Sequence, residues 1–175
     1  MLESFLVYYH SDTGIDWPTH LPPARISYLC GPTIMFKRIW IDETVDVGTN
    51  ADTLYALLKD FDAWPEWTPG LRALKRDRKE PLRVGAKFVM VIGRLSLPCQ
   101  VFAYGPSRLE WGGGLGPSIV RHSFELTPVD AAQCRLRHLE YATGVLAALA
   151  LPMEKALGAY DHRWTKTICA RFAST

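Results

Sequence analysis

The sequence lacks an excess of charge of either sign. Its 175 residues include 20 lysines and arginines against 18 aspartates and glutamates, which gives a net charge of +2. Proteins that bind nucleic acid through its phosphates usually carry a larger basic excess. The basic residues between Arg72 and Lys79 are interrupted by Asp77 and followed by Glu80, which favours a solvated surface over an anion-binding or membrane-surface patch. We therefore expect no nucleic-acid partner.

Cysteine is also scarce. The four cysteines, Cys30, Cys99, Cys134 and Cys169, are far apart, and no two have C-x-x-C spacing. This pattern indicates neither a zinc knuckle nor a redox pair. We expect free thiols, as in proteins of a reducing compartment.

A secretion signal and a long apolar run are missing as well. Glu3 precedes a short apolar patch, where a signal peptide would have a basic segment. The apolar run at residues 144–153 is too short to span a bilayer. With 48% hydrophobic and 22% charged residues, the chain has the composition of one globular domain. These features predict a soluble, cytoplasmic protein without a membrane span.

The first 37 residues are rich in glycine and proline turn signals. We interpret residues 1–37 as an N-terminal extension and residues 38–175 as the folded domain. Two interpretations of the extension remain open. It is either a poorly ordered leader or an arm or lid whose Tyr8, Tyr9 and Trp17 cover a pocket mouth or a second subunit.

The terminal segment, residues 152–172, is periodic. Apolar residues recur every three or four positions and predict a long helix with one aromatic side, made of Met153, Leu157, Tyr160, Trp164, Ile168 and Phe172. The other side is expected to face solvent and includes Glu154, Lys155, Asp161, His162, Thr165 and Lys166. Pro152 suits the first turn. The apolar side needs a partner, which the preceding strand-like segments can supply.

Residues 38–47 alternate like a half-buried strand. The apolar side consists of Ile39, Ile41, Val45 and Val47. Glu43 falls on the same side and is a candidate polar group for the interior. Thr49 or Asn50 then provides the cap of a short helix that ends before Pro65.

Several stretches resemble a known superfamily. They are Ala51–Phe61, Trp64–Pro69, Gly85, Leu109–Trp111, Phe124 and Thr127-Pro128. Over about residues 39 to 173 the chain resembles the START-like, or SRPBCC, superfamily, and in particular its polyketide cyclase/dehydrase branch. The resemblance implies an α+β helix-grip fold, in which a curved antiparallel sheet of about six or seven strands wraps around a long C-terminal helix, with two short helices after the first strand. It also implies an internal cavity for an apolar ligand.

Residues 84–104 predict a hairpin that turns at Gly93-Arg94. Phe88 and Met90 lie on one side of its first strand, either as core or as pocket lining. Pro98 indicates that the second strand lies at an edge or carries a bulge.

A run of glycines at residues 112–116 follows the strand-like residues 108–112. Because another strand-like segment comes next, a phosphate loop is disfavoured, and we predict a flexible turn at the cavity mouth. Trp111, just before the run, is either core or a stacking surface for a ligand ring. Glu110 is predicted to face Arg121 across the hairpin.

Three titratable residues fall on the apolar faces of the next hairpin. His122 interrupts one strand, and His138 and Glu140 interrupt the other. With a turn at residues 128–132, His122 would lie opposite His138, both rings would point inward, and Glu140 would follow on the same face. This register is an assumption, and a slip of one residue would turn one set outward.

Three interpretations of the histidine pair stay open. In the first, the rings are satisfied by hydrogen bonds to each other or to Glu140. In the second, they form an acid–base site, because histidine titrates near neutral pH. In the third, they bind a metal together with a carboxylate, although the family resemblance suggests none. We adopt the second interpretation and expect neither a metal nor a cofactor.

The leading hypothesis is an enzyme that binds a small apolar or aromatic, polyketide-like molecule and cyclises or dehydrates it. His122 and His138 are the expected proton donor and acceptor, Glu140 would orient one of them, and the Tyr160 hydroxyl would bind a carbonyl oxygen. The expected ligand-binding residues are Phe88, Met90, Trp111, Phe124, Met153 and Leu157. The alternatives are a non-catalytic carrier or sensor of a lipid-like ligand and a partner-binding module that uses the N-terminal arm. Monomer and homodimer both remain open.

Overall fold

The structure is a computed structural model that describes residues 37–115, 118–149, 152 and 154–173. Residues 1–36 of the predicted extension (residues 1–37) lie outside this range, as does Met153, whereas Lys37 is the first residue of β1. The elements are β1 (Lys37–Val47), α1 (Ala51–Lys59), the 3-10 helix η2 (Phe61–Ala63), α2 (Trp64–Trp67), β2 (Leu71–Lys75), β3 (Lys87–Ile92), β4 (Leu95–Gly105), β5 (Arg108–Leu115), β6 (Ser118–Pro128), β7 (Cys134–Thr143), α3 (Gly144–Leu149) and α4 (Glu154–Arg171).

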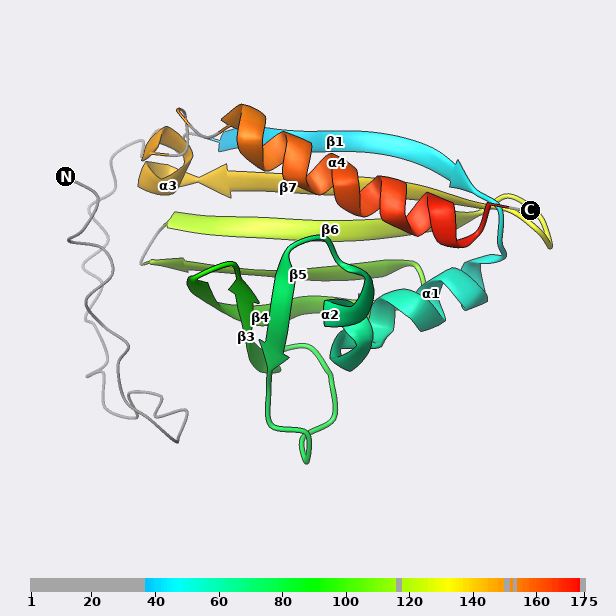
Figure 1. The fold of residues 1–175 in the computed structure, drawn as a ribbon, viewed down its shortest axis with the longest axis horizontal. Helices are drawn as coiled ribbons and strands as arrows, with labels where there is room; N and C mark the ends of the chain where they lie inside the picture. The colour runs from blue at the N-terminus through cyan, green and yellow to red at the C-terminus, as the bar shows by residue number, and fades with distance from the viewer. Residues whose placement is uncertain (1–36, 116–117, 150–151, 153, 174–175) are drawn as a thin grey trace, which may run out of the picture. The chain divides into compact units, whose positions relative to one another are not determined.

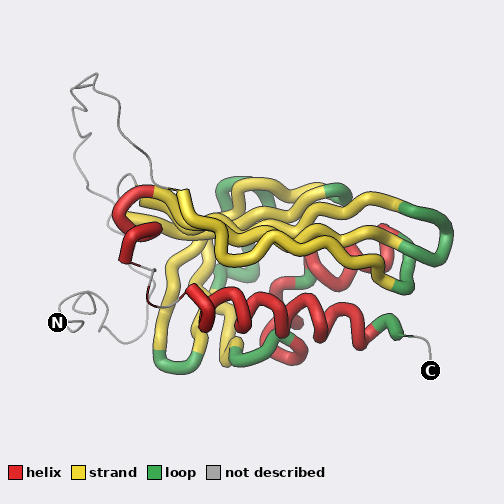
Figure 2. The backbone as a smooth tube through the Cα atoms, turned by 90° about the horizontal axis from the view of Figure 1, so that it is seen from above, coloured by secondary structure: helices red, strands yellow, loops and turns green. Residues whose placement is uncertain are grey.

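Seven strands form one antiparallel sheet in the order β1-β7-β6-β5-β4-β3-β2. Helix α4 lies along the concave side of this sheet, and α1 and α2 lie on the same side beyond its C-terminal half (Figure 1). Viewed from above, the strands curve around the helix (Figure 2). The predicted helix-grip α+β fold is therefore confirmed, with seven strands and two short helices after β1.

Strand β1 follows the predicted alternation with one exception. Ile41 and Val47 are buried, but Ile39 is 45% exposed. The β1–β7 register shifts between Ile39 and Ile41, so a bulge at Trp40 turns the preceding residues over. The prediction that Ile39 faces inward is wrong for this reason.

The short helices follow local signals in the chain. The Asn50 side chain caps α1 by accepting a hydrogen bond from the Thr53 amide at 2.8 Å, so Asn50 and not Thr49 is the cap. Pro65 lies in the first turn of α2, where its missing N–H is not needed. Trp64 and Trp67 are thereby buried against α4, where both contact Trp164.

The β3–β4 hairpin turns at Gly93-Arg94, as predicted. Pro98 pairs with Val89 of β3, whereas β4 pairs with β5 only from Gln100 onward. The backbone of β5 still comes close to Pro98, since a Cβ at Gly113 would lie 2.3 Å from the Pro98 carbonyl oxygen, so β4 is an inner strand and not the predicted edge strand. A bulge follows between Val101 and Ala103.

The glycine run forms a strand and not the predicted turn. Gly112, Gly113 and Gly114 all belong to β5 and pair with β6. A Cβ atom at Gly112 would lie 1.9 Å from the backbone oxygen of Val120. Glycine is therefore required here because the two backbones approach too closely for a side chain.

The terminal helix is divided differently from the prediction. Residues 144–149 form the separate helix α3, and α4 begins at Glu154 instead of Pro152. The Arg38 guanidinium of β1 forms an ion pair with the Glu154 carboxylate at the start of α4. One turn later, Gly158 brings the helix close to β1, since a Cβ there would lie 2.8 Å from the Trp40 carbonyl oxygen. These contacts hold α4 over the sheet.

No helix among the described residues is both long and apolar enough to cross a membrane. Cys99, Cys134 and Cys169 are free thiols, as predicted, and Cys30 lies outside the described residues.

Candidate functional site

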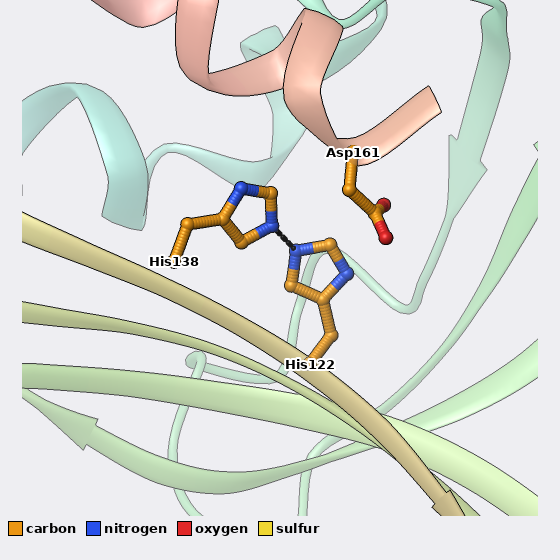
Figure 3. Close-up of side chains that lie close together, drawn as sticks. All are labelled: His122, His138 and Asp161. Atoms are coloured by element: carbon orange, nitrogen blue, oxygen red, sulfur yellow. Dashed lines mark hydrogen bonds between the residues drawn. The ribbon is translucent and has the colours of Figure 1, made fainter. Parts of the chain in front are cut away.

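A pair of buried histidines lies between the sheet and α4. His122 of β6 and His138 of β7 are 6% and 0% exposed. Their Nε2 atoms are 2.5 Å apart, so the nitrogen that carries the proton donates a hydrogen bond to the other (Figure 3). The Nδ1 atom of His138 lies 2.8 Å from the Thr165 hydroxyl of α4. Both rings therefore point inward, as the alternation along the strands predicts.

The strand register differs from the predicted one. His122 lies opposite Glu140, and Phe124 lies opposite His138. The turn comprises residues 129–133, where the Val129 amide donates to the Gln133 carbonyl, so the pairing is offset by two residues from the assumed one. An offset of two keeps every side chain on its predicted face. The predicted direct opposition of the two histidines is wrong, but their long side chains still meet diagonally.

A second pair of titratable groups adjoins the histidines. Glu140 of β7 interacts with Asp161 of α4, which is 1% exposed. In Figure 3 the Asp161 carboxylate points from α4 toward the two rings. One oxygen of Glu140 lies 3.8 Å from His122 Nδ1. The site is thus a connected cluster of two carboxyl groups and two imidazoles.

Burial shifts the pKa values of the carboxyl pair upward. Burial raises the pKa of Glu140 well above its usual value, and the hydrogen bond with Asp161 and its charge raise it further. Burial also raises the pKa of Asp161, although the hydrogen bond from Glu140 partly offsets this rise. Two adjacent carboxyl groups whose pKa values are raised favour a state in which the pair holds one proton between them.

The pKa values of the two histidines shift downward, opposite to those of the carboxyl pair. Burial lowers the pKa of His138 to about 3 and that of His122 well below its usual value, and for His122 the neighbouring His138 adds to the effect. Both imidazoles are therefore neutral at physiological pH. A neutral ring can accept or relay a proton, but it is not a cationic acid.

The prediction that Asp161 and Thr165 lie on the solvent side of α4 is wrong. They are 1% and 2% exposed and face the histidines. A signal was present in their spacing. Each lies four residues from the next along the line Leu157, Asp161, Thr165, which borders the apolar stripe through Trp164 and Ile168. The buried side of α4 is wider than its apolar residues alone indicate, and it includes Asp161 and Thr165.

Tyr160, a predicted catalytic residue, is close to the carboxyl pair. Its hydroxyl oxygen is buried, and the Trp164 indole N–H lies close enough to donate to it. Burial raises the pKa of Tyr160, while the neighbouring Trp164 indole N–H lowers it in part, and Asp161 and Glu140 are near enough to add to the rise. The phenol is consequently a neutral, unpaired donor beside the cluster.

Glu43 borders the site from β1. It lies opposite His138 in the strand register, on the inward side as predicted. Its Oε2 is 2.8 Å from Nδ1 of the exposed His162, whereas its Oε1 is buried without a partner. Its charge raises the pKa of Asp161. Glu43 therefore acts on the cluster through electrostatics and not through a hydrogen bond.

The predicted ligand-binding residues are mostly in the core. Phe88, Met90, Trp111 and Phe124 are 5% exposed or less. Trp111 stacks on the His122 ring with centroids 4.2 Å apart and planes at 20°. It also contacts Trp164 and Phe124. Trp111, Phe124 and Trp164 form an aromatic wall beside the histidines. Contact between the predicted residues and a ligand stays a prediction.

The remaining two predicted residues lie toward the start of α4. Leu157 is partly buried and stands one turn before Asp161. Met153 lies outside the described residues. The water-accessible side of the cluster belongs to Glu140, whose side chain is 14% exposed, compared with 8% for His122. Of these two side chains, Glu140 is the more accessible to water.

Three of these side chains have the donor types of a metal site. One atom each from His122, His138 and Asp161 lie within 4.8 Å of one another. Two nitrogens bound to one zinc ion at about 2.0–2.1 Å with tetrahedral angles would be roughly 3.3 Å apart. The Nε2 atoms are closer than this, at 2.5 Å. The arrangement fits a hydrogen-bonded pair, and a metal ion would require the rings to separate.

Comparison with known proteins supports this description of the fold. A family model described as "Polyketide cyclase / dehydrase and lipid transport" matches residues 38–165. No curated protein matches the chain.

Solved structures with similar folds share little sequence with this chain. Norcoclaurine synthase from Thalictrum flavum is 13% identical with a TM-score of 0.59, covering 81% of this chain and 96% of its own. The Zhui aromatase/cyclase from Streptomyces sp. R1128 is 12% identical with a TM-score of 0.56, covering 78% and 93%. A START superfamily protein from Mycobacterium smegmatis is 17% identical with a TM-score of 0.56, covering 79% and 96%. At these identities the similarity establishes the fold alone.

Proposed function

The chain belongs to the polyketide cyclase / dehydrase and lipid transport family, and from this membership and the buried cluster we propose that it binds a small apolar molecule and cyclises or dehydrates it by proton transfer. Neither reaction requires a change of oxidation state. Both require one group that removes a proton and one that returns it. Two solved structures with this fold carry cyclase or synthase names, which supports a reaction of this kind.

The observation that carries the proposal is the proton-sharing pair of Glu140 and Asp161. The pair is buried, its pKa values are raised, and no lysine or arginine among the described residues forms an ion pair with either carboxyl group. Carboxyl groups with raised pKa values are matched to acid–base work near neutral pH. The unprotonated carboxylate would remove a proton from the ligand, and the protonated partner would return one.

Glu140 is the group that we assign to contact with the ligand. It is the member of the pair that water reaches, whereas Asp161 is covered. His122, whose Nδ1 is 3.8 Å from Glu140, would form a neutral polar wall beside that carboxyl group, while His138 and Thr165 hold the His122 ring. This assignment reverses the roles expected from sequence alone, because burial makes both imidazoles poor cationic acids.

Proton transfer can be tested without knowing the natural substrate. We would incubate the protein with β-tetralone, an enolisable aromatic ketone, in deuterium oxide and follow exchange at its α-carbon by NMR. The wild type should accelerate exchange, and Glu140→Gln should reduce this acceleration by about a hundredfold or more. Glu125→Gln is the matched control, because Glu125 lies on the outward side of β6, where Arg137 donates to it at 3.2 Å; its rate should stay within about twofold.

A carrier of lipid-like molecules is the second candidate function. It is favoured by the internal hydrogen bonds of the histidines, which already have partners in each other and in Thr165. A carrier would bind the ketone without accelerating its exchange, and that result would overturn the enzyme proposal. Equal exchange rates for the wild type and Glu140→Gln would remove Glu140 from the mechanism.

A further inference from the structure

Helix α3 exposes large apolar side chains to solvent. It contains no charged residue, and none occurs anywhere in the sequence from Gly144 to Met153. Val145 is 65% exposed and Leu149 is 55% exposed. The two residues are four positions apart, so they lie on the same side of the helix. Single exposed apolar side chains are common on protein surfaces, but an uncharged helix with an apolar outer side indicates a binding surface.

The orientation of α3 is fixed by its contacts with β6. Gly144 has a φ of 65°, and a Cβ there would lie 2.6 Å from the hydroxyl oxygen of Ser118. Ser118 is buried, and its hydroxyl accepts a hydrogen bond from the Val145 amide at 2.9 Å. Ala147 is buried at 2% exposure. At about 100° of rotation per residue, Val145 and Leu149 lie on the side of the helix opposite Ala147. They therefore point away from the domain.

Basic side chains border this apolar side. Helix α3 lies at one end of the sheet, beside the starts of β1 and α4 and at the opposite end from α1 (Figure 1). Exposed lysines occur at the first residue of β1 and in the first turn of α4, namely Lys37 and Lys155. The Lys37 ammonium lies 4.2 Å from the centre of the Tyr141 ring. The neighbouring Arg38 and Glu154 neutralise each other in an ion pair. The border of the apolar side is therefore positively charged.

We propose that α3 docks this protein on the surface of a membrane that contains anionic lipids. Val145 and Leu149 insert at the boundary between the headgroups and the acyl chains. Lys37 and Lys155 lie over the negatively charged headgroups. The Tyr141 ring suits the same boundary, where aromatic side chains with a polar end are favoured. Because only one helix of six residues inserts, the binding is weak and reversible.

The size of the apolar side argues against a second copy of the chain as its partner. With six residues, α3 is only about 9 Å long. A stable dimer buries about 800 Å² on each partner, which is far more than one such helix offers. In a twofold contact through α3, Lys37 and Lys155 would also approach the same lysines of the second copy. A lipid surface requires no such area and attracts the lysines.

The test measures sedimentation of the full chain with phosphatidylcholine vesicles that contain about 30% phosphatidylglycerol. The wild type should bind these vesicles, and Val145→Asp should reduce the lipid affinity by about tenfold or more, because a valine no longer enters the apolar region. Val129→Asp is the matched control. Val129 is 44% exposed in the turn before β7, so the whole length of that strand separates it from α3. Its affinity should stay within about twofold of the wild type.

Further variants separate apolar insertion from charge. Leu149→Ser adds no charge and should also weaken binding by about tenfold or more. It keeps the test valid if Val145→Asp does not fold, which its melting temperature reveals. Lys37→Gln and Lys155→Gln should each weaken binding by about fivefold, and vesicles of phosphatidylcholine alone should bind the wild type more weakly. Lys79→Gln, at an exposed lysine between β2 and β3, is the control and should bind like the wild type.

Three results would overturn this inference. They are a wild type that does not bind the anionic vesicles, variants of α3 that bind as well as the wild type, and equal losses in Val145→Asp and Val129→Asp. A wild-type dimer that Val145→Asp converts to a monomer, without vesicle binding by either, would assign α3 to a second copy instead. Analytical ultracentrifugation measures this. The acid–base cluster takes no part in the assay, so its result is independent of the proposed function.

Discussion

The outward and inward faces of β6 and β7 differ in whether their ionisable side chains are paired with an opposite charge. On the outward face, arginines meet carboxylates directly: Arg137 donates to both Asp42 oxygens at 2.8 and 2.9 Å, and Arg135 donates to Asp46 at 2.8 Å. On the inward face, His122, His138 and Glu140 face α4 without any lysine or arginine partner among the described residues. Both sets come from the same strands and alternate residue by residue.

This difference separates structural charges from functional ones. The hydrogen bond from Arg137 lowers the pKa of Asp42, so that side chain stays ionised, which is what a surface ion pair needs. On the inward face burial dominates, and it moves carboxyl and imidazole pKa values in opposite directions, toward the neutral form of each. Neutral, hydrogen-bonded groups that can exchange protons with each other are suited to acid–base chemistry.

The largest expected effect on stability comes from a substitution at Gly112, where β5 and β6 pair closely. Gly112→Ala places a Cβ against the Val120 backbone oxygen at 1.9 Å, where the pairing of β5 with β6 leaves no room for it. We expect the free energy of unfolding to fall by about 3 kcal/mol. Gly105→Ala, at a position with nothing within 4 Å of the added atom, should change it by less than about 0.5 kcal/mol. Chemical denaturation measures both, and similar losses would show that close approach at Gly112 is unimportant.

The next effect concerns the histidines in acid. The pKa of His138 is lowered to about 3 in the folded protein, against 6.5 for the free side chain. Its contribution to stability is therefore present above pH 6.5 and is lost as the pH falls toward 3. When the pH is lowered from 7.5 to 4.5, the free energy of unfolding of the wild type should fall by about 2–3 kcal/mol more than that of His138→Gln.

Ser123→Ala is the control for this comparison, because Ser123 is a buried, non-titrating neighbour on β6. Its free energy of unfolding should run parallel to that of the wild type at every pH. Parallel curves for His138→Gln and the wild type would show that the ring is not neutral in the folded protein.

A smaller effect, with the opposite dependence on pH, distinguishes a carboxyl group on the inward face from one on the outward face. Because the folded pKa of Glu140 is raised, its contribution is present below pH 4.5 and is lost as the pH rises through the folded value. Glutamine resembles the protonated form, so the free energy of unfolding of Glu140→Gln should rise relative to that of the wild type as the pH increases from 4 to 7. Asp42→Asn on the outward face should do the reverse and lose about 0.5 kcal/mol or less, since the pKa of Asp42 is lowered and the pair is exposed. Slopes of the same sign would contradict the distinction between the faces.

Much of the fold could be predicted from sequence because it depends on short-range periodicity. Alternation by two placed His122, His138 and Glu140 on the inward face, and this held although the register was assumed wrongly. The error at Ile39 had a different origin, since a bulge changes the alternation without a clear mark in the sequence. The glycine run was misread because close approach of two strands and a flexible turn both select glycine.

By itself, the sequence determined which side chains share a face, since the alternation of a strand and the repeat of a helix are local properties of the chain. Only the tertiary structure decided which faces meet. It placed Asp161 and Thr165 against the histidines, because the path of α4 across the sheet depends on contacts such as Gly158 against Trp40 and Arg38 against Glu154. Burial, and with it the direction of every pKa shift at the site, follows from that packing.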